Sequence, residues 1–333
     1  MVAVQLKWKK KKNLGLRRAH IHIDLHLLLY LSLMLLSPAE KQYLYDSLSH
    51  TPIIRPDSRS VHQYRPLEAT TSFLPGSNGS ARIRLLEGSE CIVSVKAKVV
   101  PVELNASNDI SLLNLIDVDV DIAGYRDDSN YISNLKFQLI NLLHQNFPHL
   151  VLQLTTRYAF KLFIDCVIIS HLSYPLSLIS LATYLALKTT RLPLLVSEPN
   201  DLQVAEYPTF SDDWDNARTI EEVMADKKIN QVFKPPIFIS IGVIGKNLIF
   251  DPSVEEEQVL ENGIVVSFYN NKVITPITNG NFALNSNNSN FKGLNKSVLV
   301  KCITLCNQYC PAIIKALDAL IEQEGGQGDV SIF

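Results

Sequence analysis

The spacing of apolar residues shifts along the chain from the alternation typical of strands to the three-to-four-residue period of helices, and it does so twice. Strand-like spacing begins at Leu67 and predicts further strands over 81–86, 91–100, 117–122 and 158–169. The segment 117–122 alternates strictly between Asp and an aliphatic residue, so its strand has one acidic and one apolar face. The Asn78-Gly79 pair indicates a turn before the second strand.

Helical spacing follows the strands in the first half and closes the second half. A helix is predicted over 38–48 with Ser37 as its cap, and Glu40, three residues further on, completes a capping box. Further helices are predicted over 129–145, 176–187 and 296–322, the last with a kink at Pro311.

The second half repeats the plan of strands followed by a helix. Two hairpins are predicted, one joining 237–243 to 247–250 and one joining 263–269 to 272–276 around Asn270-Asn271. Residues 201–230 are polar and predict a linker or a surface excursion, and the Asn-rich stretch 279–295 predicts a mobile loop. The chain is therefore predicted to be an α+β protein, with mixed sheets packed with helices and a division near residue 210.

Length and apolar content agree with two cores. The chain has 333 residues, of which 47% are hydrophobic, enough for two domains. We divide it into an N-terminal extension (1–33), a first domain (34–210), a linker (211–236), a second domain (237–322) and a tail (323–333).

The N-terminal extension differs from the rest of the chain. A basic run precedes a Leu-rich stretch at 25–36, which resembles a signal peptide but is shorter than the roughly 20 apolar residues that span a bilayer. The alternative is that translation begins at Met34 and that the preceding stretch is an artefact of the gene model. We favour the alternative, because nothing downstream is typical of a secreted protein.

Charge is unevenly distributed. The first 33 residues hold seven Lys and Arg against one acid, which leaves 24 basic and 32 acidic residues for the rest of the chain. A body that acidic is a poor nucleic-acid binder alone. Contact with RNA is therefore expected only beside partners that supply positive charge.

Motifs for catalysis are missing from the sequence. It contains no Walker loop, dinucleotide-binding fingerprint, nucleophile elbow or zinc-type Cys/His spacing. The carboxylates of 117–122 could hold Mg²⁺, but an exposed acidic strand face is commoner. Cys302, Cys306 and Cys310 recur every four residues, which favours a packed helix face over a metal site. Neither a metal nor a cofactor is predicted.

Several segments, in their order and spacing over about 38–320, resemble the RNase PH family. Ile-Arg-Pro-Asp-Ser-Arg at 54–59 resembles the Ile-Arg-x-Asp-Gly-Arg loop of that family, with Ser58 in place of glycine. Asp-Pro-Ser-Val-Glu-Glu-Glu at 251–257 resembles its Asp-Pro-Thr-x-x-Glu-Glu stretch. The other matching segments are 88–98, 117–128 and 160–166.

The resemblance implies the ribosomal protein S5 domain 2-like fold, duplicated in one chain, and a subunit of the ring of the eukaryotic RNA exosome. Its implied partners are related RNase PH-like ring subunits, S1- or KH-type cap subunits, a hydrolytic nuclease of the RNase II/R type, and RNA. Such a complex processes and degrades RNA from the 3′ end, including rRNA maturation and mRNA turnover. The implied location is the nucleus, the nucleolus and the cytoplasm, without a membrane.

Two departures from the family pattern imply a catalytically inactive subunit with no catalytic residue. Phosphorolytic members hold phosphate in a Gly-Arg-Ser loop, where this chain reads Gly-Tyr-Arg-Asp-Asp at 124–128. Arg126 is kept there, but Asp127 and Asp128 would repel phosphate. Active members also carry an Asp-Gly-Gly stretch that leads to the catalytic acid, where this chain reads His-Leu-Ser-Tyr-Pro at 171–175.

RNA contacts are expected at basic residues of the matching segments, namely Arg55, Arg59, Lys96, Lys98 and Arg126. The alternative for each is a solvated side chain or an ion pair between subunits. Two other functions stay open: an active phosphorolytic 3′-to-5′ exoribonuclease that works as a homo-ring, and a membrane-tethered or secreted protein of unrelated role.

Overall fold

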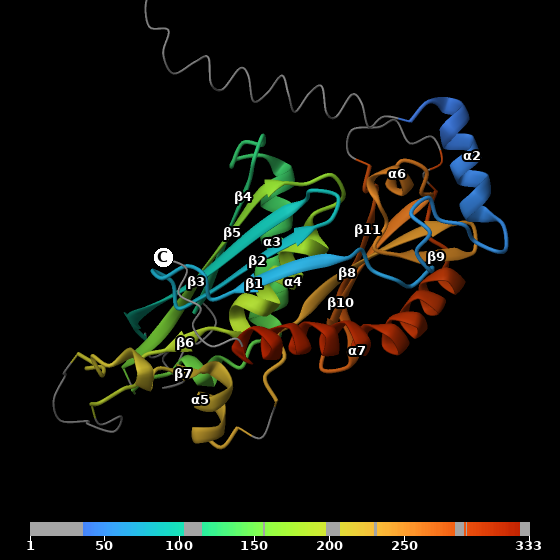
Figure 1. Cartoon of the computed structure of the whole chain (residues 1–333). Helices are drawn as coiled ribbons and strands as arrows, with labels where there is room; N and C mark the ends of the chain where they lie inside the picture. Colours follow the sequence, from blue (N-terminus) through green and yellow to red (C-terminus); the bar gives the residue numbers. More distant parts are fainter. Residues whose placement is uncertain are drawn as a thin grey trace, which may run out of the picture.

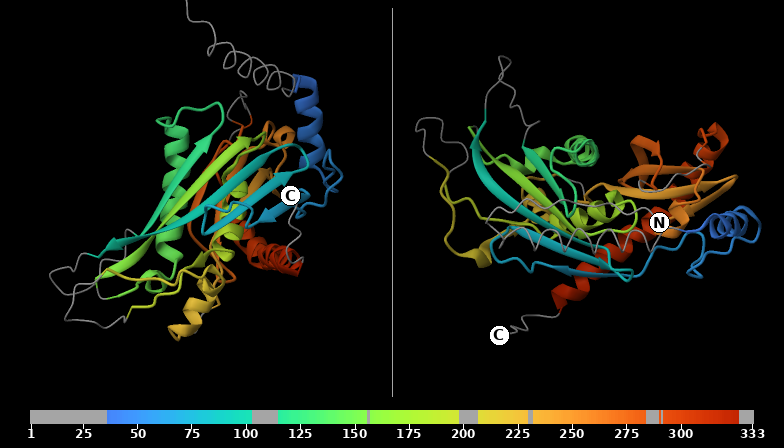
Figure 2. Two further views of the ribbon diagram at one scale, coloured as in Figure 1. Left: turned by 60° about the vertical axis from the view of Figure 1, so that its left-hand side comes forward. Right: turned by 90° about the horizontal axis from the view of Figure 1, so that it is seen from above.

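A computed structural model of the chain describes residues 36–102, 115–155, 157–197, 207–229, 232–283, 290 and 292–326. The extension predicted over 1–33 lies outside these residues. Within them, the two larger sheets and their helices pack side by side, as Figures 1 and 2 show. The α+β fold with mixed sheets that the sequence predicts is confirmed.

The first sheet has five strands, in the order β1 (Leu67–Thr71), β2 (Gly79–Leu85), β3 (Glu90–Pro101), β5 (Tyr158–Ser170) and β4 (Ile116–Ile122). All neighbours run antiparallel except β4 and β5, which are parallel and joined through helix α3 (Asn130–Asn146). Helix α3 and helix α4 (Leu176–Lys188) contact this sheet on the face that carries Leu162 and Ile164, which are buried. Asp165 and Val167 alternate with those residues and are exposed on the other face.

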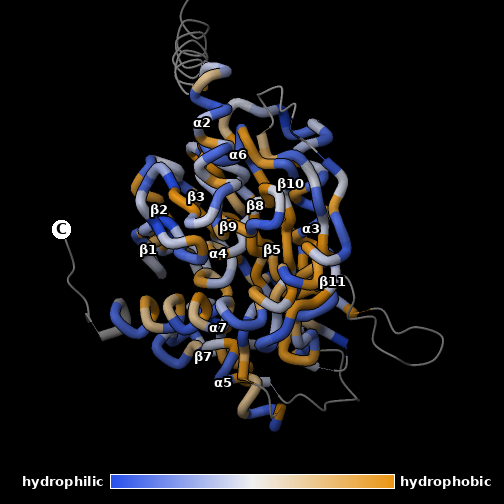
Figure 3. The backbone as a smooth tube through the Cα atoms, turned by 90° about the vertical axis from the view of Figure 1, so that its right-hand side faces the viewer, coloured by the Kyte–Doolittle hydropathy of each residue, from blue (hydrophilic) through white to orange (hydrophobic). Residues whose placement is uncertain are grey.

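The second sheet has four strands, in the order β11 (Lys272–Gly280), β10 (Asn262–Tyr269), β8 (Ile237–Ile244) and β9 (Asn247–Phe250). All of its pairs are antiparallel, and both predicted hairpins are present. Asn270 and Asn271 take φ angles of 49° and 61°, as the primed turns of two-residue hairpins require. Every residue of β8 is buried. Figure 3 shows that hydrophobic residues are concentrated in β5, β8 and β10.

Helix α7 (Lys296–Gly326) contains Pro311, and Figure 1 shows that it changes direction along its length. Cys302, Cys306 and Cys310 are all buried on it, which confirms the predicted packed face. The part Lys296–Gln323 has the length and apolar character of a membrane span, by composition alone. Its buried face packs on β1, β10, β11 and α4.

Helix α2 (Pro38–Ser49) begins at the predicted capping box of Ser37 and Glu40. It packs against the second sheet, although our division by sequence grouped it with the first domain. The Asn247 side chain donates to the carbonyl of Leu48 at 2.9 Å, and the Tyr45 hydroxyl donates to Glu261 at 2.6 Å. The N-terminal helix therefore ties the start of the chain to its second half.

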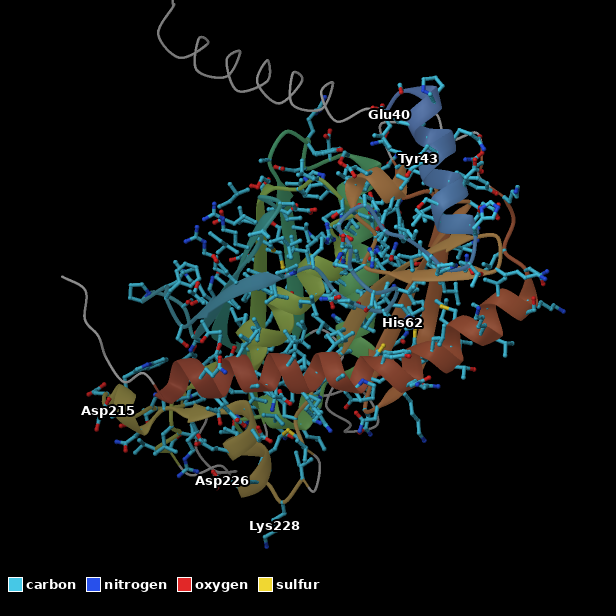
Figure 4. All side chains as sticks on the ribbon, turned by 45° about the vertical axis from the view of Figure 1, so that its right-hand side comes forward. Glu40, Tyr43, His62, Asp215, Asp226 and Lys228 are labelled. Atoms are coloured by element: carbon cyan, nitrogen blue, oxygen red, sulfur yellow. The ribbon has the colours of Figure 1, made fainter. Side chains whose placement is uncertain are left out.

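The loop after α2 leads back to α7. The His62 ring stacks on Tyr309 at 4.2 Å and meets Phe250 edge-on at 5.2 Å. Figure 4 shows His62 beside α7. One continuous cluster of buried residues takes in both sheets. The domain boundaries stay a prediction.

The segment predicted as a linker holds regular structure where it is described. It contains η3 (Trp214–Asn216), β7 (Arg218–Thr219), which pairs with β6 (Arg191–Leu192), and α5 (Ile220–Asp226). Thr219 and Glu222 form a capping box at the start of α5, and Ile220 and Met224 are buried. Two further short helices were not predicted, namely η2 (His149–Leu152) and α6 (Val254–Glu257). Residues 284–289 and 291 of the predicted Asn-rich loop lie outside the described residues.

Candidate functional site

The two segments that depart from the RNase PH pattern lie together. Gly124 ends β4 with a φ of 89°, and Ser129 caps α3 by accepting from the backbone N–H of Ile132. Between them, the Tyr125 ring lies 5.7 Å from the His171 ring. The loops 124–128 and 171–175 thus form one site, as the resemblance implies.

The loop 124–128 offers no prepared place for an anion. The Arg126 side chain is 85% exposed and donates to the Asp128 carboxylate at 2.8 Å. Asp127 is exposed beside it. These two carboxylates precede the N-terminus of α3, where the helix dipole favours negative charge. Asp127 and Asp128 already place negative charge at the N-terminus of α3, and they would repel phosphate there.

The loop 171–175 is held in place by the rest of the chain. The backbone N–H of Leu172 donates to the Ser89 hydroxyl at 3.2 Å, and that of Tyr174 donates to Glu257 at 2.8 Å. Arg65 donates to the Ser173 hydroxyl at 2.7 Å. These three hydrogen bonds fix the position of the loop 171–175. The loop itself contains no carboxylate.

The ring side chains of this loop, His171 and Tyr174, are uncharged at neutral pH. Burial lowers the pKa of His171, which keeps its imidazole neutral. Burial and the nearby Glu257 raise the pKa of Tyr174 to about 12. The Tyr174 ring stacks on Phe282 at 4.7 Å. The loop 171–175 therefore presents aromatic surface and supplies no acid or guanidinium fork of its own.

A buried ion pair lies behind the site. Arg55 is 2% exposed, and its Nε and Nη2 donate to the two oxygens of Glu256, each at 2.7 Å. Its remaining donors bond the carbonyls of Phe250 at 3.1 Å and Asp251 at 3.0 Å. This two-pronged geometry is the strongest form of Arg–carboxylate pairing.

A second buried carboxylate, that of Asp251, accepts hydrogen bonds from two arginines. Arg65 donates to it from its backbone N–H at 2.8 Å and from its Nε at 2.9 Å, and Arg59 adds a bond at 3.3 Å. Burial opposes ionisation of Asp251, yet Arg65 and Arg59 hold its pKa below the usual value. Arg65 also pairs with Glu87. The family-like segments 54–59 and 251–257 thus meet in one interior ion cluster.

The predicted RNA-contact residues divide into two groups. Arg55 and Arg59 are buried and paired, so their guanidinium groups have no exposed face to offer RNA in this chain. Lys96 and Lys98 are exposed on the open face of the first sheet, and Arg126 is exposed at the loop 124–128. RNA contact at these three stays a prediction.

The sequence reasoning missed Arg65 and Glu257, and it assigned no role to Asp251. The two acids belong to the matching segment 251–257, which was the one available signal. Arg65 does not belong to any of the segments that match the family. Its contact with Asp251, 186 residues further along the chain, is visible only in the folded structure.

The acidic strand face that could have held Mg²⁺ carries lysine partners. Asp119 accepts from Lys136 at 2.8 Å, and Asp117 pairs with Lys161 at 3.3 Å. Among the residues that the structure describes, no group of three or more His, Cys, Asp or Glu side chains is arranged to hold a metal ion.

Glu257 gives a pH-dependent prediction. Burial raises its pKa from 4.5 to about 8, against the opposing effects of the Tyr174 N–H and Arg65. The folded state therefore binds a proton that the unfolded state releases, and stability falls as the pH rises from about 4.5 to 8, by about 1 kcal/mol per pH unit.

We expect Glu257→Gln to remove this component, because the amide matches the neutral acid. Urea unfolding of both proteins at pH 5, 6, 7 and 8 measures it. The variant should gain stability relative to the natural chain as the pH rises. Parallel stability curves for the two proteins would contradict the raised pKa of Glu257.

The fold and the position of the two loops define a class of protein that has the architecture of the RNase PH type of 3′ exoribonuclease. The model of the RNase PH 3′ exoribonuclease family, domain 1, matches residues 63–193. Exosome complex component RRP42 from Saccharomyces cerevisiae is 42% identical over 289 residues, which cover 86% of this chain and 100% of that relative. The chain belongs to the RNase PH family and is a homologue of this yeast exosome component.

Other comparisons agree. Exosome complex component rrp42 from Schizosaccharomyces pombe is 31% identical over 246 residues, 68% of this chain and 76% of that relative. Among solved structures, an archaeal exosome core aligns over 84% of this chain and 96% of its own, with a TM-score of 0.59 and 15% identity. An Archaeoglobus fulgidus exosome with RNA bound to its active site gives a TM-score of 0.57 at 13% identity, over 84% of this chain and 97% of its own. At such identities these structures support the fold alone.

Proposed function

We propose that this chain is a catalytically inactive ring subunit of an exosome-type complex, which supports 3′-to-5′ RNA processing and degradation. Its contribution is assembly and guidance of RNA. The partners are related RNase PH-like subunits, S1- or KH-type cap subunits and a hydrolytic nuclease of the RNase II/R type. The complex works in the nucleus and nucleolus and also in the cytoplasm.

One observation supports inactivity above the others. The site pairs Arg126 with its own neighbour Asp128, and the adjoining loop 171–175 has no carboxylate to serve as an acid. Phosphorolysis needs a bound phosphate as nucleophile and a group that moves a proton to the leaving oxygen. The loop 171–175 supplies neither group itself, and the guanidinium of Arg126 is already paired.

The rate of phosphorolysis tests the proposal. We expect the purified full chain to release no nucleoside diphosphate from single-stranded RNA in inorganic phosphate, above a reaction without protein. An active RNase PH enzyme serves as the positive control. Release of nucleoside diphosphate that rises with phosphate concentration would contradict inactivity and support the alternative of a phosphorolytic exoribonuclease.

A further inference from the structure

A two-stranded ribbon, formed by residues 194–197 and 207–211, lies over the start of β5. Leu195 pairs with Phe210 across this ribbon, in antiparallel orientation. Phe210 stacks on the buried Phe160 of β5, with 5.5 Å between the ring centres. Because successive side chains of a strand point to opposite sides, the ribbon is anchored by one face and exposes the other.

The exposed face of the ribbon and the short helix η3 after it carry large apolar side chains. Val196 is 65%, Tyr207 is 61% and Trp214 is 50% exposed. Exposure of such side chains to water costs free energy, and Trp and Tyr are enriched among the residues that dominate binding at protein interfaces. Three of them on one connected segment indicate a surface that another molecule covers.

Carboxylates flank Trp214 on both sides along the chain. The sequence Asp-Asp-Trp-Asp at 212–215 contains no basic residue, and all four of its side chains are exposed. Asp213 accepts from the backbone N–H of Asp215 at 3.1 Å and so caps η3. Among the described residues, the carboxylates of Asp212 and Asp215 make no ion pair or hydrogen bond with another side chain.

Two basic residues of the adjoining elements are already paired with other acids. Arg218 of β7 pairs with Asp226, and Lys188 of α4 pairs with Glu221 at 3.0 Å. Figure 4 shows Asp215 at the edge of the molecule. The negative charge at this edge is therefore available to a partner.

Arginine fits this combination of an exposed indole and free carboxylates. Its guanidinium group stacks on aromatic faces and forms two-pronged hydrogen bonds to carboxylates. The attraction of a cation for an aromatic ring is largest for Trp. RNA fits the surface poorly, because Asp212, Asp213 and Asp215 would repel its phosphates. A purely apolar partner would desolvate the same carboxylates without supplying the opposite charge.

We propose that a Trp214 surface, made of Val196, Tyr207, Asp212, Trp214 and Asp215, binds an extended, arginine-rich segment of a partner protein. A guanidinium group of the partner stacks on the indole and bonds the flanking carboxylates. Val196 and Tyr207 continue the surface along the ribbon, where the apolar parts of an extended segment can follow it.

The Trp214 surface is separate from the candidate site. Tyr207 packs on Tyr158 at the start of β5, with 5.3 Å between the ring centres, whereas the loop 171–175 follows the end of that strand. At about 3.3 Å per residue, the 13 residues of β5 place the two roughly 40 Å apart. The proposal therefore does not depend on the proposed function, and each can fail without the other.

The fluorescence of Trp214 provides the direct test. Trp8 is the other tryptophan of the chain, so Trp8→Phe leaves Trp214 as the single reporter. We expect a synthetic peptide of Arg-Gly-Gly repeats, added to this full-length variant, to change the emission of Trp214 until it saturates. The same peptide with Lys in place of Arg should bind about fivefold more weakly, because an ammonium group cannot stack on the indole. No change in emission, equal affinity for the two peptides, or an equal response to single-stranded RNA would overturn the proposal.

Substitutions assign the binding to this surface. Trp214→Ala should weaken binding of the fluorescently labelled arginine peptide about fivefold, measured by anisotropy. The double change Asp212→Asn with Asp215→Asn should do so by a similar factor, because it removes both free carboxylates. All three side chains are exposed, so the variants should keep the circular dichroism spectrum of the natural chain.

Matched changes elsewhere on the chain are the controls. Tyr43→Ala removes an aromatic side chain that is 78% exposed on α2. Glu68→Gln with Asp165→Asn removes two exposed carboxylates of the first sheet. Both should leave the affinity for the peptide within about twofold. Losses equal to those of the Trp214 surface would mean that the peptide binds the acidic body as a whole, and would overturn the proposal.

Discussion

Replacement of Arg55 by Ala is expected to lower the free energy of unfolding by about 3–5 kcal/mol, because it leaves a buried carboxylate without its partner. Glu256 has no exposed side-chain surface, and both of its oxygens accept from Arg55. The change also leaves the carbonyls of Phe250 and Asp251 without these donors. Urea unfolding, followed by circular dichroism, measures the loss.

The control for this prediction is Arg84→Ala. Arg84 is exposed on the open face of the first sheet and lies in no ion pair among the described residues. We expect its removal to change the stability by less than about 0.5 kcal/mol. If Arg55→Ala costs no more than Arg84→Ala, the buried ion cluster does not join the two halves as described.

Gly79→Ala is expected to destabilise the fold by about 3 kcal/mol, since no space exists for a methyl group at this position. A Cβ there would lie 2.6 Å from the carbonyl oxygen of Ala186 and 2.7 Å from the Cα of Thr190. Both are backbone atoms, in the last turn of α4 and just after it, and they cannot yield as a flexible side chain can. Helix α4 packs on β2. The thermal midpoint and urea unfolding report the loss.

Gly76→Ala is the matched control, in the turn three residues before Gly79. A Cβ at Gly76 would meet nothing within 4 Å. The stability should change by less than about 0.5 kcal/mol. Equal losses for the two variants would mean that general flexibility of the turn, and not the contact of β2 with α4, decides the effect.

The parts of the fold that local chemistry decides could be predicted from the sequence. Ser37 and Glu40 satisfy each other's backbone groups within one turn, so the start of α2 was correctly predicted. Asn270 and Asn271 tolerate positive φ angles, so the β10–β11 hairpin was predicted as well. The same capping signal stands at Thr219 and Glu222, but the polar composition around it led us to predict a linker in place of α5.

Contacts between residues distant in sequence could not be predicted. Arg55 and Arg59 were predicted to contact RNA, which requires exposed guanidinium groups. Their burial follows from the position of Asp251 and Glu256, which lie about 200 residues further along the chain. No local pattern indicates that α2 packs against a sheet formed from residues 237–280.

The candidate site is an intermediate case. The family resemblance selected the segments 124–128 and 171–175, and the fold brings them together through Tyr125 and His171. Which groups surround them was not accessible from sequence. The raised pKa of Glu257 and the neutral aromatic surroundings depend on burial by several elements at once.

We propose that this chain acts as one non-catalytic member of a ring of related subunits. Native mass spectrometry of the complex purified through a tag on the full chain tests this claim most directly. The account predicts a single copy of the chain in a particle that also contains other RNase PH-like chains in fixed proportion. A chain recovered alone, or only as an assembly of identical copies, would contradict it.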